Sequence, residues 1–469
     1  MFTTFATVMI ADGSGILVTL LGYGQTFFAA IIVLGVLIFV HEFGHFIVAK
    51  KLGVGVEKFS LGFGPKLFGK QIGDTEYLLS AIPLGGYVKL TGEDPEEECE
   101  NEEHSFTEAS VWRRLAIVSA GPVFNILFAV LIFTIVFMVG VPALSSVIEN
   151  VIEGSPAMKA GLQAGDKILS IDGKKVRLRS EVSEIVHNSL DKELLFKVDR
   201  NDQILTFYVN TESRKSKNLF GEEITIAFVG INYIPSIVGK VRDNSPAMKA
   251  KLQGGDKILA IDGKRISLWD DLREIVHNSP DKELTFKIDR NGQQFKVNIT
   301  PESHQTKNSL GQKVKIGLIG IEPTFNNPES NFVKGRYNPV IAVYKGFQET
   351  WRITYLTVVA IKKLFQRVIP ADTIGGPIMI LQTAGEQAKI GILNLVFFVA
   401  LLSINLGILN LLPIPILDGG HILFFLIEIV IGKPVSGKKR EIAQQVGMAL
   451  LLLLMAFAFY NDIDRIFRK

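Results

Sequence analysis

The stretch TFFAAIIVLGVLIFVHEFGHFIVA, residues 26–49, is an apolar run with two histidines and a glutamate near its C-terminal end. It is long enough to cross a bilayer, which takes about 20 residues. An unpaired ionisable side chain at that depth costs roughly 2.5–3.5 kcal/mol, so three of them within five positions need a shared purpose. On a helix, positions i and i+4 share a face, so His41 and His45 can chelate one metal ion with Glu42 beside it. The run therefore predicts a zinc site inside the membrane, with Glu42 as the catalytic base.

A third protein ligand is expected, because catalytic zinc sites usually have three. The sequence contains a single cysteine, Cys99, which excludes a thiolate cluster. The candidate is Asp418 in NLLPIPILDGG, residues 410–420, at the end of another apolar run. The prolines break the helix there, and broken backbone at lipid depth is tolerated only where it lines a cavity or packs on protein. Taken alone, this peptide fits a helix-ending turn at the interface, but beside an intramembrane HExxH pattern it favours Asp418 as the ligand.

The composition of the whole chain favours a membrane protein with soluble parts. Of the 469 residues, 48% are hydrophobic, and the mean hydropathy is +0.29. The 50 basic and 47 acidic residues leave no excess charge for nucleic acid, which is not expected as a partner. Four runs are apolar enough to span the bilayer: 26–49, 112–140, 391–417 and 441–460. The second of these runs contains Gly121-Pro122 and Asn125.

Basic residues near the ends of these runs predict the orientation of the chain. Lys50 and Lys51 follow the first span, whereas residues 1–25, the N-terminal outer segment, contain no lysine or arginine. Arg113 and Arg114 lie at the start of the second span, and four basic residues lie between the third and fourth. These flanks are expected in the cytoplasm, with the HExxH pattern near that side. Both termini and the long segment between spans two and three are then outside, although basic residues in the C-terminal tail, 461–469, weaken the rule.

The region between the first two spans, 50–111, combines a glycine-rich part with an acidic loop. Short alternating strings such as EYLLSAIPLGGYVKL indicate β-hairpins rather than helix. A small sheet on the cytoplasmic side is therefore expected to follow the first span.

The segment before the first span lacks the basic region of a cleavable signal peptide.

An internal repeat lies between the second and third spans. SPAMKAGLQAGDKILSIDGK at Ser155 returns as SPAMKAKLQGGDKILAIDGK at Ser245, and 32 of the 46 residues from 155 to 200 are identical to those 90 positions later. So long a period predicts two copies of a whole domain, 141–230 and 231–324, each with strands around two short helices. The GSPA, GD and IDG pattern resembles PDZ domains of bacterial proteases.

Residues 325–385 place apolar side chains at helical spacing with charges between them, which predicts amphipathic helices near the outer membrane surface. The sequence thus predicts a polytopic α-helical membrane protein with four transmembrane helices. It also predicts a membrane-associated β-hairpin region and two tandem PDZ domains of the β-rich α+β class.

HEFGH in the first span, NLLPIPILDGG in the third and the repeats between spans two and three together resemble the site-2 protease family of intramembrane zinc metalloproteases. The resemblance covers nearly the whole chain. It implies that His41, His45 and Asp418 bind Zn²⁺ and that Glu42 is the base. Residues that it implies at the substrate cleft are Asn410, Pro413 and Pro415, together with Gly62, Phe63 and Gly64 in a membrane-re-entrant hairpin.

The resemblance also implies a multi-pass protease of the bacterial inner membrane with periplasmic PDZ domains and termini. Its expected substrates are single-span membrane proteins already trimmed on the outer side, such as an anti-sigma factor in envelope stress signalling, and remnant signal peptides. The PDZ pair is expected to act as a size filter rather than to recruit C-termini. Two alternatives are a non-proteolytic PDZ membrane scaffold and a membrane metalloprotease of another class. The intact HExxH pattern with Asp418 argues against the first, and the intramembrane LDGG stretch argues against the second.

Overall fold

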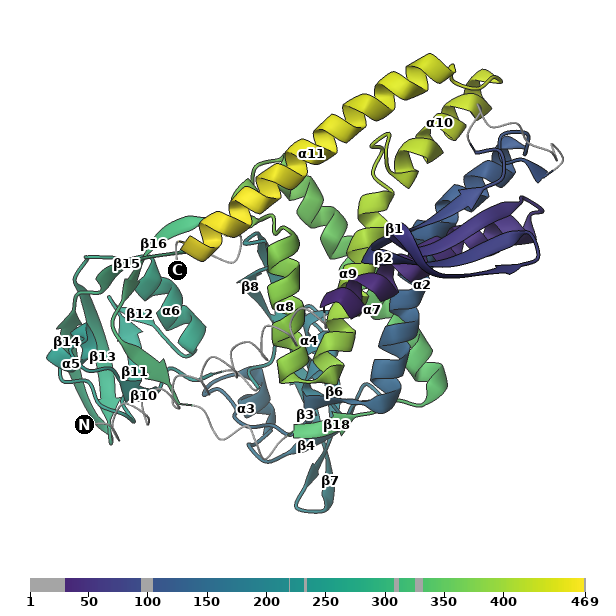
Figure 1. Cartoon of the computed structure of the whole chain (residues 1–469). Helices are drawn as coiled ribbons and strands as arrows, with labels where there is room; N and C mark the ends of the chain where they lie inside the picture. The colour runs from purple at the N-terminus through teal and green to yellow at the C-terminus, as the bar shows by residue number, and fades with distance from the viewer. Residues whose placement is uncertain are drawn as a thin grey trace, which may run out of the picture. The chain divides into compact units, whose positions relative to one another are not determined.

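The computed structural model describes residues 30–93, 104–218, 220–231, 234–307, 312–324 and 332–467. Figure 1 shows their helices and strands. These residues belong to two compact units. Val141–Gly335 contains the internal repeat, and the residues before and after it contain the apolar helices. The predicted N-terminal segment, 1–25, and Cys99 in the acidic loop lie outside the described residues.

Four helices of the described chain are long and apolar enough to cross a bilayer, the number that the sequence predicted. The third ends at Asn410, earlier than predicted, because Pro413 and Pro415 cannot continue a helix. A separate helix, α10 (Asp418–Ile431), begins after the prolines. The four are the HExxH helix (Ala30–Lys51), α2 (Val111–Val139), α9 (Ile392–Asn410) and α11 (Gly437–Phe467).

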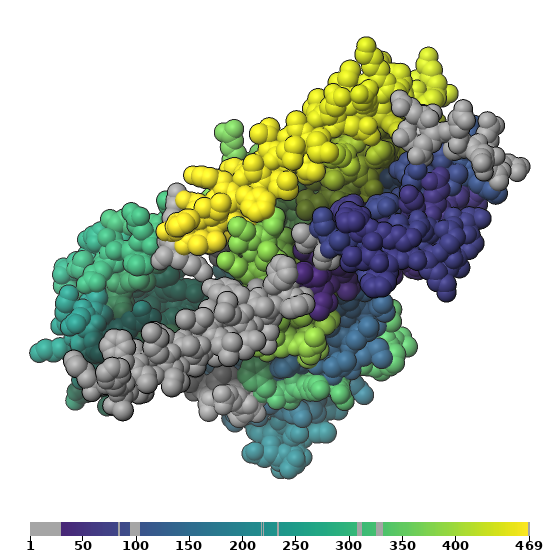
Figure 2. All heavy atoms as spheres, in the orientation of Figure 1, coloured from purple at the N-terminus to yellow at the C-terminus, as the bar shows by residue number. Residues whose placement is uncertain are grey.

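The last of these helices, α11, continues through most of the predicted tail and ends at Phe467. It lies on the surface of its unit in Figure 2, where its side chains are largely uncovered on the face shown. The apolar side chains that it exposes include Leu450, Leu453 and Leu454. Such a surface suits a lipid environment, in which exposed apolar side chains carry no cost.

Glycines let the helices around α2 approach closely. A Cβ added to Gly44 of the HExxH helix would lie 2.6 Å from the carbonyl oxygen of Ala120. One added to Gly407 of α9 would lie 2.9 Å from the carbonyl oxygen of Pro122. Small residues at such contacts are typical of helix packing in membranes. The segment of α2 around these carbonyls is therefore held between the HExxH helix and α9.

The predicted amphipathic region, 325–385, contains α7 (Pro339–Phe365), the 3₁₀ helix η3 (Ala371–Thr373) and the start of α8 (Pro377–Ile390). The helix α7 packs along α2 and α9. Its exposed aromatic side chains recur at helical spacing and so share one face: Tyr344, Phe347, Trp351 and Tyr355.

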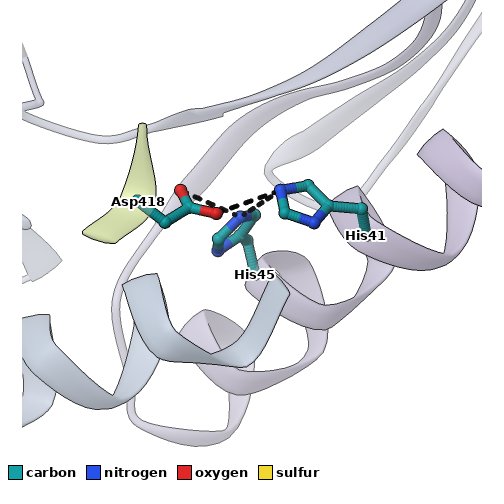
Figure 3. A group of neighbouring side chains, drawn as sticks. All are labelled: His41, His45 and Asp418. Atoms are coloured by element: carbon teal, nitrogen blue, oxygen red, sulfur yellow. Dashed lines mark hydrogen bonds and ion pairs between the residues drawn. The ribbon is translucent and has the colours of Figure 1, made fainter. Parts of the chain in front are cut away.

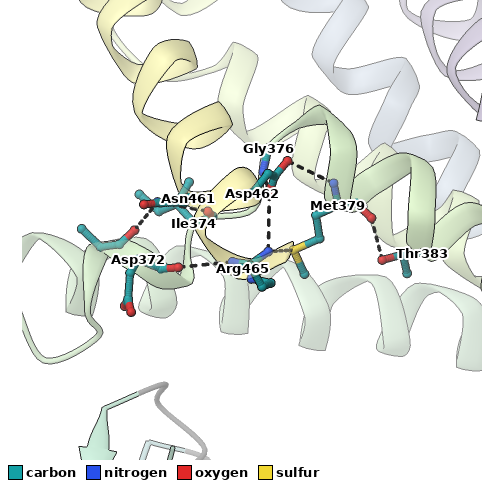
Figure 4. Close-up of polar contacts among 9 residues, drawn as sticks. Asp372, Ile374, Gly376, Met379, Thr383, Asn461, Asp462 and Arg465 are labelled. Atoms are coloured by element: carbon teal, nitrogen blue, oxygen red, sulfur yellow. Dashed lines mark hydrogen bonds and ion pairs between the residues drawn. The ribbon is translucent and has the colours of Figure 1, made fainter. Parts of the chain in front are cut away.

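A carboxylate from α11 caps α8 (Figure 4). Asp462 is 2% exposed and accepts hydrogen bonds from the backbone N–H groups of Gly376 at 2.9 Å and Met379 at 3.1 Å. Its neighbour Asn461 donates to two carbonyl oxygens of the loop before α8. A Cβ on Gly376 would lie 2.7 Å from Asp462 Oδ2, so glycine is needed there. The first N–H groups of a helix lack acceptors within that helix, and here Asp462 of α11 supplies an acceptor for two N–H groups at the start of α8.

The region after the HExxH helix forms one folded antiparallel sheet from β1 (Val56–Ile72) and β2 (Thr75–Leu90), in agreement with the predicted hairpins. Residues 56–61 pair with 86–90 on one side, and residues 58–61 pair with 76–79 on the other. The 86–90 segment thus lies at an edge of the sheet. The chain turns sharply in β1 at Gly62 and Gly64, whose φ angles of +91° and +85° favour glycine.

Each repeat folds into a four-stranded antiparallel sheet and two short helices, as predicted from the sequence. The first has the strand order β5-β4-β6-β7 and the second the equivalent order β12-β11-β13-β14. The strands of the first are β4 (Lys167–Ile171), β5 (Lys174–Lys175), β6 (Glu193–Arg200) and β7 (Gln203–Asn210), with helices α3 (Pro156–Ala160) and α4 (Arg179–His187). Those of the second are β11 (Lys257–Ile261), β12 (Lys264–Arg265), β13 (Leu284–Arg290) and β14 (Gln293–Ile299), with helices α5 (Pro246–Lys249) and α6 (Trp269–His277).

Identical residues of the two copies make identical contacts. The Ser155 hydroxyl caps α3 by accepting from the Met158 N–H. The buried Asp166 accepts two hydrogen bonds from the Arg200 guanidinium. The second copy repeats these contacts with Ser245, Met248, Asp256 and Arg290.

Two-stranded ladders complete this unit. β3 (Val141–Leu144) pairs with β18 (Phe332–Gly335), so the two ends of the unit lie side by side. The other ladders are β8 (Glu212–Lys217) with β9 (Glu223–Phe228), β10 (Val238–Val241) with β17 (Ile321–Pro323), and β15 (Glu302–Lys307) with β16 (Lys313–Leu318).

Candidate active site

Three side chains converge on one point in the helical unit (Figure 3). His41 and His45 project from successive turns of the HExxH helix, and their Nε2 atoms lie 3.3 Å apart. Asp418, the first residue of α10, brings Oδ2 to 3.1 Å from His41 Nε2 and Oδ1 to 3.7 Å from His45 Nε2. One ligand atom from each lies within 4.8 Å of the others.

This arrangement fits a zinc ion. Zinc bonds of about 2.0–2.1 Å at tetrahedral angles put neighbouring ligand atoms roughly 3.3 Å apart, close to the separations found here. Two imidazoles and one carboxylate form a three-ligand set of the kind that leaves a fourth position open for water or substrate. Asp418 Oδ2 is also buried without a hydrogen-bond partner in the described chain, which a cation would remedy.

The loop between α9 and α10 brings Asp418 to this point. After Asn410 the chain makes a tight turn in which the Leu417 N–H donates to the Ile414 carbonyl at 2.8 Å. Gly419 and Gly420 lie against this turn, and a Cβ on either would come within 2.3 Å of a loop carbonyl oxygen. The loop can therefore fold back onto α10 only because two glycines follow the aspartate.

Glu42 lies on the same helix, between the imidazoles and the sheet. Its carboxylate accepts a hydrogen bond from the backbone N–H of Val88 and lies near the side chains of His41, His45 and Asp418. A Cβ on Gly86 would lie 3.3 Å from Glu42 Cγ. The predicted base is thus held against the 86–90 edge of the sheet.

The other predicted site residues lie at different distances from this point. The amide nitrogen of Asn410 is 3.3 Å from His41 Nε2. Pro413 and Pro415 form the loop that precedes Asp418. The predicted cleft residues of the hairpin, Gly62, Phe63 and Gly64, lie at the bend of β1, where the Phe63 ring stacks on that of Tyr87.

Sequence reasoning missed the contribution of α2. The Nδ1 atom of His45 lies 2.9 Å from the carbonyl oxygen of Ile117, and that of His41 lies 3.1 Å from the Asn125 amide nitrogen. A Cβ on Gly121 would lie only 2.3 Å from His45 Nε2. A signal was present, since a glycine, a proline and an amide interrupt an apolar span, but only the tertiary contact gives it meaning.

The model of peptidase family M50 matches residues 29–454. The chain is 36% identical over 453 residues to the regulator of sigma-E protease RseP of Escherichia coli strain K12, an alignment that covers 93% of this chain and 98% of that protein. It is 37% identical over 450 residues to a protein of Vibrio cholerae named as a zinc metalloprotease, covering 94% and 98%.

A third relative, from Neisseria meningitidis serogroup A and also named as a zinc metalloprotease, is 35% identical over 450 residues, covering 94% of this chain and 99% of that protein. Among solved structures, the PDZ domain of an SdrC-like protein from Listeria monocytogenes matches 20% of this chain and 93% of its own, at 21% identity and a TM-score of 0.16. A score that low carries no argument about the fold of either repeat.

Proposed function

Because the chain belongs to peptidase family M50, and is a zinc metalloprotease of the inner membrane with several spans, we propose that it cleaves the transmembrane segments of single-span membrane proteins. His41, His45 and Asp418 are the proposed zinc ligands, and Glu42 is the proposed base. The observation that carries this assignment is the convergence of three ligand atoms within 4.8 Å of one another, two of them on a helix that is apolar enough to span a bilayer. Charged groups in such a helix are costly unless they serve a site.

The chemistry divides between the metal and the side chains. Zinc, when bound, polarises a carbonyl and lowers the pKa of water. Glu42 takes a proton from the attacking water and returns it to the leaving amine. The Val88 N–H keeps the Glu42 carboxylate oriented. The Asn410 amide, next to His41, is positioned to donate to a substrate carbonyl.

A transmembrane substrate must lose its helical hydrogen bonds before its carbonyls can react. The 86–90 segment lies at the sheet edge and next to Glu42, so an unwound peptide that pairs with this edge would pass the base. Strand addition to an open sheet edge is a common way to bind extended peptides. Gly62, Phe63 and Gly64 support this sheet by forming its bend, and Pro413 and Pro415 shape the loop that precedes Asp418.

The repeats are proposed to be periplasmic PDZ domains that exclude substrates with bulky outer parts, while the active site lies near the cytoplasmic face. The similarity to regulators of sigma-E protease supports a substrate of the anti-sigma-factor type, trimmed beforehand on its outer side. Remnant signal peptides have the same form, a single apolar span without an outer domain, and are proposed as a second substrate class.

Cleavage of a purified single-span model substrate tests the assignment of the base. Glu42→Gln keeps the size of the side chain but cannot take the proton, so turnover should fall by at least about 10². The matched control is Glu57→Gln, which changes a partly exposed glutamate in β1 and should leave turnover unchanged. Turnover by Glu42→Gln at the rate of the unmodified protein would reject the proposed base.

A further inference from the structure

Asn125 is fully buried in α2, a helix that supplies none of the proposed zinc ligands. Its amide nitrogen lies 3.1 Å from His41 Nδ1, the ring nitrogen that faces away from Asp418. Its amide oxygen is buried without a hydrogen-bond partner in the described chain. Burying an amide costs free energy unless the amide makes hydrogen bonds, so the contact between Asn125 and the His41 imidazole is expected to offset that cost.

The backbone of α2 contacts the imidazole of His45, the second histidine of the site. Its Nδ1 lies 2.9 Å from the Ile117 carbonyl oxygen, which can only accept. The proton of neutral His45 is therefore on Nδ1, and Nε2, which faces His41 and Asp418, keeps its lone pair. Pro122 has no N–H, so α2 lacks the hydrogen bond that residue 122 would donate to the carbonyl of Val118, the neighbour of Ile117.

The same logic applies to His41. Its Nε2 faces Asp418 and His45, so binding a metal there requires the proton on Nδ1 and an acceptor opposite it. In the structure, the amide nitrogens of Asn125 and Asn410 both approach Nδ1 of His41, at 3.1 Å and 3.5 Å. A single ring nitrogen cannot accept from two donors at once. The oxygen and nitrogen of an amide are indistinguishable by shape and are assigned by their partners.

We propose that Asn125 is a positioning residue whose side-chain oxygen accepts the Nδ1 proton of His41, so that α2 fixes the tautomer and orientation of both histidines. This requires the Asn125 amide to be rotated by half a turn, so that its oxygen rather than its nitrogen faces His41 Nδ1. Groups that accept the second proton of a metal-binding histidine strengthen metal binding by about 10–100-fold. This inference rests on the proposed zinc ligands.

The packing of α2 supports this role. The Ser403 hydroxyl of α9 donates to the backbone carbonyl oxygen of Asn125 at 2.7 Å. Gly407 packs against Asn125 Cβ, since a Cβ on the glycine would lie 3.5 Å from it. Gly121 leaves room for both imidazoles. Asn125 therefore sits on backbone that two neighbouring helices hold in place.

Zinc affinity of the purified full-length protein in detergent, measured by competition with a chelator, tests the proposal. Asn125→Leu keeps the approximate size but removes the acceptor, and should weaken zinc binding about 10–100-fold. Asn125→Asp offers only acceptors and should bind zinc within about threefold of the unmodified protein, or more tightly. Thr134→Val removes a hydroxyl elsewhere on α2, one that donates to the Val130 carbonyl of the same helix, and should leave the affinity unchanged.

Thermal unfolding of the zinc-free variants separates positioning from packing. A packing role alone predicts that Asn125→Leu unfolds at a lower temperature but binds zinc as the unmodified protein does, and this result would overturn the proposal. Equal losses of affinity in Asn125→Asp and Asn125→Leu would overturn it too, because a donor would then be required. If Asn125→Leu does not fold, Asn125→Asp decides alone, through retention or loss of zinc.

His45→Ala separates this inference from the proposed function. If zinc binding is unaffected by His45→Ala, the ligand assignment itself fails. If His45→Ala abolishes binding and Asn125→Leu binds normally, the ligands stand and the role of Asn125 is rejected.

Discussion

The backbone N–H of Val88 donates a hydrogen bond to the carboxylate of Glu42, so the proposed base is joined to the edge of the sheet beside it. The two residues belong to separate elements, β2 and the HExxH helix. A peptide that extends the sheet at this edge would therefore be presented next to the base.

Replacing Val88 with proline removes this donor. Proline is tolerated at sheet edges, and the lost bond to a carboxylate corresponds to about 1.5–3 kcal/mol. Turnover of a model substrate should fall about tenfold or more, while zinc content stays unchanged. Val88→Ala keeps the N–H and is the matched control. Full activity of Val88→Pro would show that the bond does not orient the base.

Replacing Gly121 with alanine tests the close approach of α2 to the proposed metal site. The added Cβ would fall 2.3 Å from His45 Nε2 and 2.8 Å from His41 Cε1, so the rings must move. We expect zinc affinity to drop by more than about tenfold and cleavage to be lost. Gly35→Ala is the control, because a Cβ at Gly35 meets nothing within 4 Å. Equal zinc affinity in both variants would contradict the geometry described.

Replacing Gly376 with alanine tests the cap that α11 supplies to α8. Its Cβ would lie 2.7 Å from Asp462 Oδ2 and 2.9 Å from the backbone of Ala458, which should displace the carboxylate. Loss of a helix cap costs about 0.5–2 kcal/mol, so thermal unfolding in detergent should begin at a lower temperature. Gly437→Ala, where a Cβ meets nothing within 4 Å, should not shift it. An unshifted transition in Gly376→Ala would mean that the cap contributes nothing to stability.

The ladder of β3 and β18 allows the repeat unit to be removed cleanly. Leu144 pairs with Phe332, so a short linker can replace residues 145–331 and leave the ladder intact. If the repeats act as a size filter, this variant should cleave a substrate that still carries its outer domain. If they recruit substrates, it should cleave neither the trimmed nor the intact form. Cleavage of the trimmed form alone would contradict both roles.

The sequence was sufficient to predict the parts of the fold that follow from local pattern. Apolar run length predicted four helices able to span a membrane, and the 90-residue period predicted two similar domains with two short helices each. The sequence also led to Asp418 as a candidate ligand, because an aspartate after two helix-breaking prolines at the end of an apolar run gains meaning beside an intramembrane HExxH pattern.

What the sequence did not reveal depends on contacts between distant segments. Asp462 seemed to belong to a tail, because nothing local indicates that it caps a helix some 86 residues earlier. Asn125 was noted only as a polar interruption, since its meaning comes from the imidazole opposite. The edge of the sheet next to Glu42 also depends on how β1 and β2 bend, and the pattern of glycines alone did not predict that bend.

Zinc bound per purified chain, measured by elemental analysis alongside cleavage, tests the central claim most directly. The account predicts about one zinc per chain in the unmodified protein and in Glu42→Gln, with cleavage only in the former. It predicts that Asp418→Ala loses both zinc and cleavage, because two histidines alone leave the site short of a ligand. Full zinc content in Asp418→Ala, or cleavage by Glu42→Gln at the unmodified rate, would contradict it.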